Sequence, residues 1–242
     1  MKRLGKILLG IVLLFLLLMA TVALQRVNPK QQMPDLKPYS FADTLAGKNY
    51  SLDSLQRIIG VNKGLPKGFE VAAAIAYSAF PELKDVGIEM VLTAGGAPME
   101  ATPVIKSLFS LTGDPRYQIL LNDADSSYFD PILLRSLPFD AQVGILAHEL
   151  GHIVYYEKLN IFGFGKWGLM YLISDDFVVT HERSTDLMPL YHGLGNQIYQ
   201  YARFVRYDPS CRAFYQNGKD FMDKYYLTDR ELLEEIKKFQ TF

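Results

Sequence analysis

The chain lacks several features that stabilise or identify small exported proteins. It has one cysteine, Cys211, among 242 residues, so no disulfide can form within the chain. Cys211 lies in a polar, loop-like stretch, and we expect it to take no part in binding a metal ion. The sequence contains no paired cysteines at metal-site spacing, no glycine-rich phosphate loop and no G-x-S-x-G motif. The stability of the fold must therefore come from packing, with a bound metal ion as a further source of stability.

The chain also lacks an excess of charge of either sign. Its 25 lysines and arginines nearly balance 26 aspartates and glutamates, which leaves a net charge of −1. A balanced chain offers no electrostatic basis for binding nucleic acid, so we expect no nucleic-acid partner. We find no internal repeat or low-complexity tract. Beyond residue 24 the chain is long enough for one domain with a sizeable core, or for two lobes around a cleft.

The N-terminus predicts the location of the protein. Basic Lys2, Arg3 and Lys6 precede residues 7–24, which carry no charge and are rich in leucine, isoleucine and valine. This run is long for a cleaved signal peptide and just sufficient for a membrane span. We therefore expect a cell-envelope protein. It would be single-pass and membrane-anchored, with its catalytic domain outside the cytoplasm, or periplasmic or secreted if cleaved after Ala23.

The most informative motif is the sequence His-Glu-Leu-Gly-His at residues 148–152. It lies in a mostly apolar segment, residues 138–159, which predicts a helix. Because residues four apart share one helix face, His148 and His152 can reach a single metal ion. Glu149 is turned by about 100° and is placed to act as a general base on water. The alternative is a buried helix with two core histidines, although buried polar side chains would then need partners.

Two histidines do not complete a catalytic zinc site, which needs a third protein ligand and an open position. The metzincin class would continue the motif with glycine at position 155 and histidine at position 158. Tyr155 and Lys158 occupy those positions, which excludes that class.

A second acidic motif lies downstream, where Glu182 and Asp186 are four residues apart and share one helical face. His181 is a rival third ligand, but a regular helix would point it to a different side from Glu182. The alternative is a solvated helix face on which Arg183 pairs with the two carboxylates.

An H-E-x-x-H motif followed by E-x-x-x-D on a second helix resembles the gluzincin metallopeptidases, the group that includes thermolysin. The resemblance covers about residues 138–190, and a short membrane-associated bacterial form is the closer comparison. It implies one zinc ion per chain, with His148, His152 and Glu182 as ligands. Asp186 would fix the tautomer of a ligand histidine. It also implies an α+β, zincin-like fold, with a small sheet and the active-site helix in an N-terminal lobe and a mostly helical C-terminal lobe.

The function implied by this resemblance is that of a zinc-dependent endopeptidase. Glu149 would take a proton from the attacking water and pass it to the leaving amine. We expect a peptide or protein substrate, and a membrane as partner through the N-terminal segment. The alternatives are a non-hydrolytic zinc-binding envelope scaffold or binding module, and a membrane-tethered structural domain without metal. The intact Glu149 argues against the first, since only catalysis requires a carboxylate there.

The rest of the chain divides into an expected linker, residues 25–50, and one metallopeptidase domain, residues 51–242. The linker carries three prolines among polar residues. Within the domain the patterns predict helices and strands. The helices are at residues 69–80, 191–205, 220–226 and 228–239, the last beginning with a Thr-Asp-Arg-Glu capping box, and the strands are at 86–93 and 116–122.

Substrate binding is expected at a strand. In gluzincins a sheet edge at the cleft pairs with an extended peptide, and residues 117–122 precede the H-E-x-x-H helix. Tyr117, Ile119 and Leu121 are therefore tentative substrate-binding residues, with an ordinary central strand as the alternative.

Two features remain open in the sequence. Residues 161–174 are aromatic, rich in glycine and nearly uncharged, but too short to span a bilayer. They could pack as core, form a flap over the cleft, or lie on a membrane surface with Lys166 and Trp167 at the headgroups. His192 could donate a hydrogen bond to the transition state, but we interpret it as a surface or capping residue.

Overall fold

The structure is a computed structural model, and it describes residues 45, 48–60, 62–108, 116–124 and 128–240. No helix in these ranges is both long and apolar enough to cross a membrane. This finding corrects the expected localisation as a single-pass, membrane-anchored protein. Residues 7–24, on which that expectation rested, lie outside the described residues, as does the possible cleavage position after Ala23.

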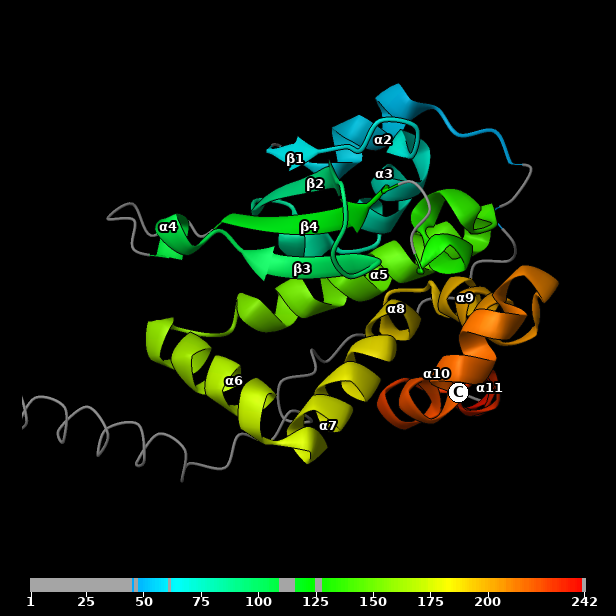
Figure 1. Cartoon of the computed structure of the whole chain (residues 1–242). Coiled ribbons are helices and arrows are strands. Elements are labelled where there is room, and N and C mark those ends of the chain that lie inside the picture. Colours follow the sequence, from blue (N-terminus) through cyan, green and yellow to red (C-terminus); the bar gives the residue numbers. More distant parts are fainter. Residues whose placement is uncertain (1–44, 46–47, 61, 109–115, 125–127, 241–242) are drawn as a thin grey trace, which may run out of the picture.

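The described residues form a mixed α/β fold with one small sheet (Figure 1). Its four strands are β1 (Lys63–Gly64), β2 (Gly87–Thr93), β3 (Met99–Pro103) and β4 (Arg116–Asn122). Their order is β1-β2-β4-β3, with β1, β2 and β4 parallel and β3 antiparallel to β4. The two strands predicted from the sequence, at residues 86–93 and 116–122, are confirmed as β2 and β4.

The interpretation of residues 117–122 as an edge strand is wrong. β4 pairs with β2 on one side and β3 on the other, so its backbone is already bonded on both sides. Every second residue of a strand points to the same face, so Tyr117, Ile119 and Leu121 all point to the inner face of the sheet. Their side chains are almost completely buried. They therefore belong to the core, and β3 is the strand at that edge of the sheet.

Helices α3 (Glu70–Ser78) and α5 (Phe139–Tyr156) share one core with the inner face of the sheet, and α2 (Leu52–Ile59) packs against α3. The long helix α5 runs beside β3, and α3 packs against α5 (Figure 1). The Tyr156 hydroxyl donates to the carbonyl of Ala101 on β3 over 3.3 Å. Nearly every side chain of α5 is buried, because the sheet and the C-terminal helices enclose it. The predicted helix at residues 138–159 is thus confirmed, ending slightly earlier.

The remaining described chain is almost entirely helical. Ser174 caps α7 by accepting from the Phe177 amide, and the predicted capping box at Thr228 and Glu231 is confirmed by reciprocal bonds of 2.8 and 3.2 Å. The further helices are α4 (Ile105–Leu108), α6 (Ile161–Ile173), α7 (Asp175–Asp186), α8 (Met188–Tyr191), α9 (Gly195–Tyr207), α10 (Arg212–Tyr225) and α11 (Asp229–Gln240).

The folded part begins before residue 51, which was the expected start of the domain. Leu45 is buried, and its amide donates to Asp140 at the start of α5 over 2.8 Å. The same carboxylate oxygen accepts from the Gln197 side chain on α9, also at 2.8 Å. One buried carboxylate therefore joins the end of the expected linker, α5 and α9.

Two glycines allow other helices to approach α5 closely. A Cβ at Gly144 would overlap the backbone carbonyl of Gln197 and lie 2.6 Å from the Ile198 nitrogen. A Cβ at Gly151 would lie 2.8 Å from the Cβ of Met188 on α8. Only glycine at these positions permits α8 and α9 to cross α5 at the observed distance.

We expect Gly144→Ala to lower the free energy of unfolding by about 1–3 kcal/mol or more, because the added methyl group meets rigid backbone. Gly165→Ala is the matched control, since a Cβ there meets nothing within 4 Å. In the interior of α6 the control should stabilise by up to about 1 kcal/mol through helix propensity. Urea unfolding measures both values, and equal effects would contradict the close crossing of α5 and α9.

Candidate metal centre

The structure brings His148, His152 and Glu182 together, although 30 or more residues separate the glutamate from the histidines. Their ligand atoms all lie within 4.8 Å of one another, and all three side chains are buried. The Nε2 atoms of both histidines lie 3.6 Å from Oε2 of Glu182. In a tetrahedral site with bonds of about 2.0–2.1 Å, ligand atoms are about 3.3 Å apart. The two distances of 3.6 Å are close to this value, and the three groups together can hold one metal ion.

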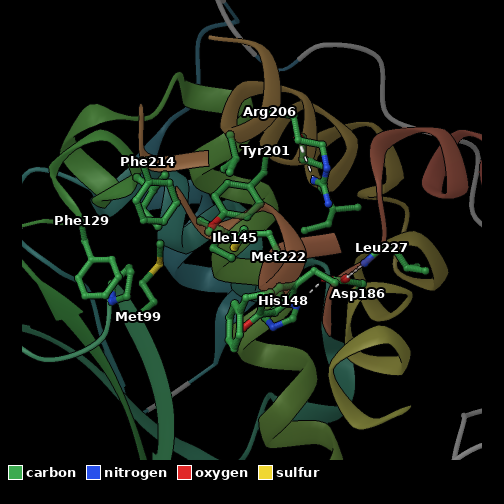
Figure 2. A pocket seen from close by; sticks show the side chains of 18 of the residues that line it. Met99, Phe129, Ile145, His148, Asp186, Tyr201, Arg206, Phe214, Met222 and Leu227 are labelled. Atoms are coloured by element: carbon green, nitrogen blue, oxygen red, sulfur yellow. Dashed lines mark hydrogen bonds and ion pairs between the residues drawn. The ribbon is translucent and has the colours of Figure 1, made fainter. Parts of the chain in front are cut away.

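Asp186 holds the ring of His148. Its Oδ1 lies 2.9 Å from His148 Nδ1, and its Oδ2 accepts from the Leu227 amide over 2.7 Å (Figure 2). The carboxylate therefore favours a proton on Nδ1, which leaves Nε2 free to bind metal. Burial opposes a charge on His148, but Asp186 and Glu182 outweigh it and raise the pKa of His148 well above its usual value.

His181 holds the ring of His152 and does not join the three-residue cluster. Its Nε2 lies 3.1 Å from Nδ1 of His152. Burial, followed by the charge of His152, lowers the pKa of His181 to about 3, so it is a neutral acceptor near pH 7. In the sequence His181 is a rival third ligand; in the structure it orients His152 instead. No local pattern indicates this contact.

Glu182 is oriented from the other side by Tyr171, whose hydroxyl donates to Oε1 over 2.8 Å. Burial favours the neutral acid, but His152 and His148 reverse this effect and lower the pKa of Glu182, so the side chain is a carboxylate. The alternative of a solvated face is excluded, because Glu182 and Asp186 are buried and Arg183 pairs with Glu231. Sequence reasoning missed Tyr171.

Tyr171 also clarifies the role of α6, the segment for which the sequence left three roles open. On the inner side of α6, Trp167 packs against the core and lies 5.8 Å from the His181 ring. Lys166 is buried as well, so these two side chains do not face outward as a membrane-surface arrangement would require. The opposite side of α6 leaves Phe162 and Leu172 exposed.

Glu149 lies beside the three-residue cluster and is not part of it. It is 5 % exposed, and burial raises its pKa, although His152 and His148 act in the opposite direction. The backbone amide of Ala101 on β3 is close enough to lower the pKa of Glu149. A carboxylate with a raised pKa can both accept and return a proton near neutral pH.

The backbone of β3 borders this site. The Asn122 amide donates to the Pro98 carbonyl over 3.0 Å, so positions 98 and 122 form a hydrogen-bonded pair of the antiparallel ladder. The backbone groups of Met99 and Ala101 therefore turn away from β4. Ala101 presents its amide towards Glu149 and its carbonyl to Tyr156.

Two other residues considered in the sequence lie elsewhere. His192 is buried between the Glu82 carboxylate, 2.7 Å from its Nε2, and the Phe80 ring, stacked at 3.9 Å. Its burial makes the surface interpretation wrong, but the capping interpretation is confirmed: His192 is the C-cap of α8, and its Nδ1 lies 2.7 Å from the Met188 carbonyl oxygen. Cys211 is buried and donates to the carbonyl of Pro131 over 3.6 Å. Neither belongs to the three-residue cluster.

No protein-family model, curated protein or solved structure matches this chain.

We expect His181→Ala to weaken zinc binding about 10–100-fold, because His152 loses the group that orients its ring. Zinc titration against a competing chelator measures this change. His192→Ala removes another buried histidine and is the control: it should lower stability without changing zinc affinity. Equal zinc affinities in wild type and His181→Ala would contradict the orienting role.

Zinc affinity should also fall as the pH is lowered from about 8 to 6, because metal must displace a proton from His148. The carboxylates raise the pKa of His148, so protons compete at a higher pH than for an ordinary histidine. Replacing Asp186 with asparagine removes one source of this rise and should shift the decline to lower pH. Chelator titrations at several pH values test this, and a pH-independent affinity would contradict it.

Proposed function

We propose that this chain is a zinc-dependent endopeptidase with a zincin-like fold. The observation that carries the proposal is the buried group His148, His152 and Glu182. A fourth buried side chain, Glu149, lies next to this group but is not one of its members. A structural metal site would not need that additional carboxylate, whereas hydrolysis by an activated water does.

The donor set favours zinc over other common metals. Two imidazole nitrogens and one carboxylate oxygen suit zinc, while calcium and magnesium prefer oxygen ligands alone. Three protein ligands leave one position of a tetrahedral site open, as catalytic zinc sites do. When bound, zinc would lower the pKa of a water molecule to near 7 and polarise the substrate carbonyl.

The remaining chemistry belongs to the residues of the chain. Glu149 accepts the proton of the attacking water and then gives it to the leaving amine. Its raised pKa favours this second step, since a strongly acidic carboxyl group would hold a proton too briefly to deliver it. Asp186, His181 and Tyr171 hold the three ligands in place and exclude alternative rotamers.

The edge strand β3 is the structural element to position an extended peptide. The backbone groups of Ala101 already bond Glu149 and Tyr156, whereas those of Met99 face the same side of β3 without such a bond among the described residues. A peptide chain that pairs with Met99 would lie beside the metal centre and be held by main-chain hydrogen bonds. β3 thus replaces β4 in the role expected from the sequence.

We expect Glu149→Gln to retain zinc and to lose hydrolysis by a factor of about 10²–10⁴, because the amide cannot accept the water proton. The measurement is cleavage of a mixed peptide library by the full chain, read by mass spectrometry. Glu157→Gln, the same change at an exposed position next to the end of α5, is the control and should cleave like wild type. Undiminished turnover in Glu149→Gln would exclude Glu149 as the base.

His148→Ala should lose zinc as well as activity, since two ligands remain and the ring held by Asp186 is gone. Metal analysis after gel filtration measures the loss. Full zinc occupancy in this variant would place the metal elsewhere in the chain. Zinc binding by the wild type without any cleavage would instead favour a non-hydrolytic module.

A further inference from the structure

Helix α6 has an apolar outer face that no described part of the chain covers. The helix lies at the edge of the described fold, with α7 beside it (Figure 1). Its inner side carries Trp167, which packs against the core, and Tyr171, which donates to Glu182. Residues three, four and seven apart share one helix face. The outer face consists of apolar residues alone, namely Ile161, Phe162, Gly165, Leu169, Leu172 and Ile173.

The outer face of α6 is large enough to form an interface. Phe162, Leu172 and Ile173 are 64, 85 and 66 % exposed. With Ile161 and Leu169 they present roughly 500 Å² of apolar surface, and a contiguous patch of that size is typical of an interaction site. Two such faces would bury about 1,000 Å² in total, which is the lower limit for a specific interface between proteins.

The outer face is complementary to itself when two copies of α6 pack antiparallel. A two-fold axis at the middle of the helix relates positions that are equally far from its two ends. It places Phe162 of one copy against Leu172 of the other, and Ile161 of one copy against Ile173 of the other. Each of these large side chains therefore meets an apolar partner.

The glycine in this face and the charges beyond its ends fit the same arrangement. Leu169 of one copy lies over Gly165 of the other, where an added Cβ would meet nothing within 4 Å, so the leucine has room. Lys158 precedes α6 and Asp176 follows it, and both are exposed. An antiparallel pair brings these opposite charges together at both ends, whereas a parallel pair brings like charges together. Because Glu82 of its own chain also attracts Lys158, the charges set the direction and the apolar contacts supply the affinity.

A membrane surface would also cover apolar side chains, but α6 does not suit it. Helices that lie on a membrane carry lysine or arginine along their polar face. Lys166 is the only charged residue of α6, and it is buried. Asp176, just beyond the helix, would be repelled by anionic headgroups. A second copy of the chain offers both the apolar surface and the opposite charge.

We propose that the chain forms a homodimer through antiparallel pairing of the outer faces of α6. This inference does not depend on the proposed peptidase function. The interface leaves the inner side of α6 unchanged, so Tyr171 still donates to Glu182 in each copy. Because the buried area is at the lower limit for a specific interface, dimer and monomer should be in equilibrium.

Sedimentation velocity of the full chain over a range of concentrations measures this equilibrium. The wild type should shift from monomer to dimer as its concentration rises. Leu172→Glu should weaken self-association by a factor of about 100 or more, because each dimer loses two buried leucines. Ile58→Glu is the matched control and should dimerise like wild type. Ile58 is 58 % exposed and lies on α2, away from α6 (Figure 1).

Two results of this experiment would overturn the proposal. A wild type that stays monomeric at every concentration would mean that a membrane or another part of the chain covers the face. Self-association that persists in Leu172→Glu would place the contact elsewhere, for example at residues 7–24.

A mixture of two variants tests the antiparallel register and separates it from a folding defect. Phe162→Lys and Leu172→Glu should each fail to pair with themselves. Mixed together they should form a heterodimer, because the new lysine of one variant faces the new glutamate of the other. At the other end of the pair, the native Phe162 and Leu172 still meet. Energy transfer between differently labelled copies measures this pairing, and a mixture that stays monomeric would overturn the antiparallel contact.

Discussion

The structure depends on the pairing of polar side chains that are buried where α5 meets α7. His148 and His152 on α5 face Glu182 and Asp186 on α7, and all four side chains are buried. Each alone would be costly to bury, but together each finds a partner within hydrogen-bond or ion-pair distance. The two helices can thus hold a dense set of charges inside the protein, as a metal ligand set requires.

The surrounding packing serves this contact. Gly151, between the two histidines, permits α8 to approach α5, and α8 directly follows the helix that carries Glu182. The Leu227 amide, which precedes α11, satisfies the second oxygen of Asp186. Tyr171 on α6 satisfies the second oxygen of Glu182. Two further segments therefore fix the orientation of side chains on α7, and neither adds a member to the three-residue cluster.

The sequence was sufficient where the signal is local. The spacing of His148 and His152 and the apolar pattern around them predicted α5 and the shared helix face of the two histidines. The capping box predicted the start of α11, and β-type patterns predicted β2 and β4. These features depend on residues within one or two turns or on a short strand.

The sequence was insufficient where contacts join distant segments. The residue pattern of β4 does not indicate which strands pair with it. Its position between β2 and β3 could therefore not be predicted from the sequence. β3 was missed because it is short and bounded by prolines, although prolines are typical of edge strands. The contacts of Tyr171 with Glu182 and of His181 with His152 arise from helix packing, which no spacing in the chain reveals. The apolar cavity beside His148 and Glu149 has the same origin, since its lining comes from separate segments between residues 98 and 232.

The central claim is that His148, His152 and Glu182 bind one zinc ion. X-ray absorption at the zinc edge, measured on the full chain purified without chelator, tests it most directly. The account predicts one zinc per chain, with two imidazole nitrogens and oxygen ligands at about 2.0–2.1 Å. A third imidazole, a sulfur ligand or the absence of bound zinc would contradict it.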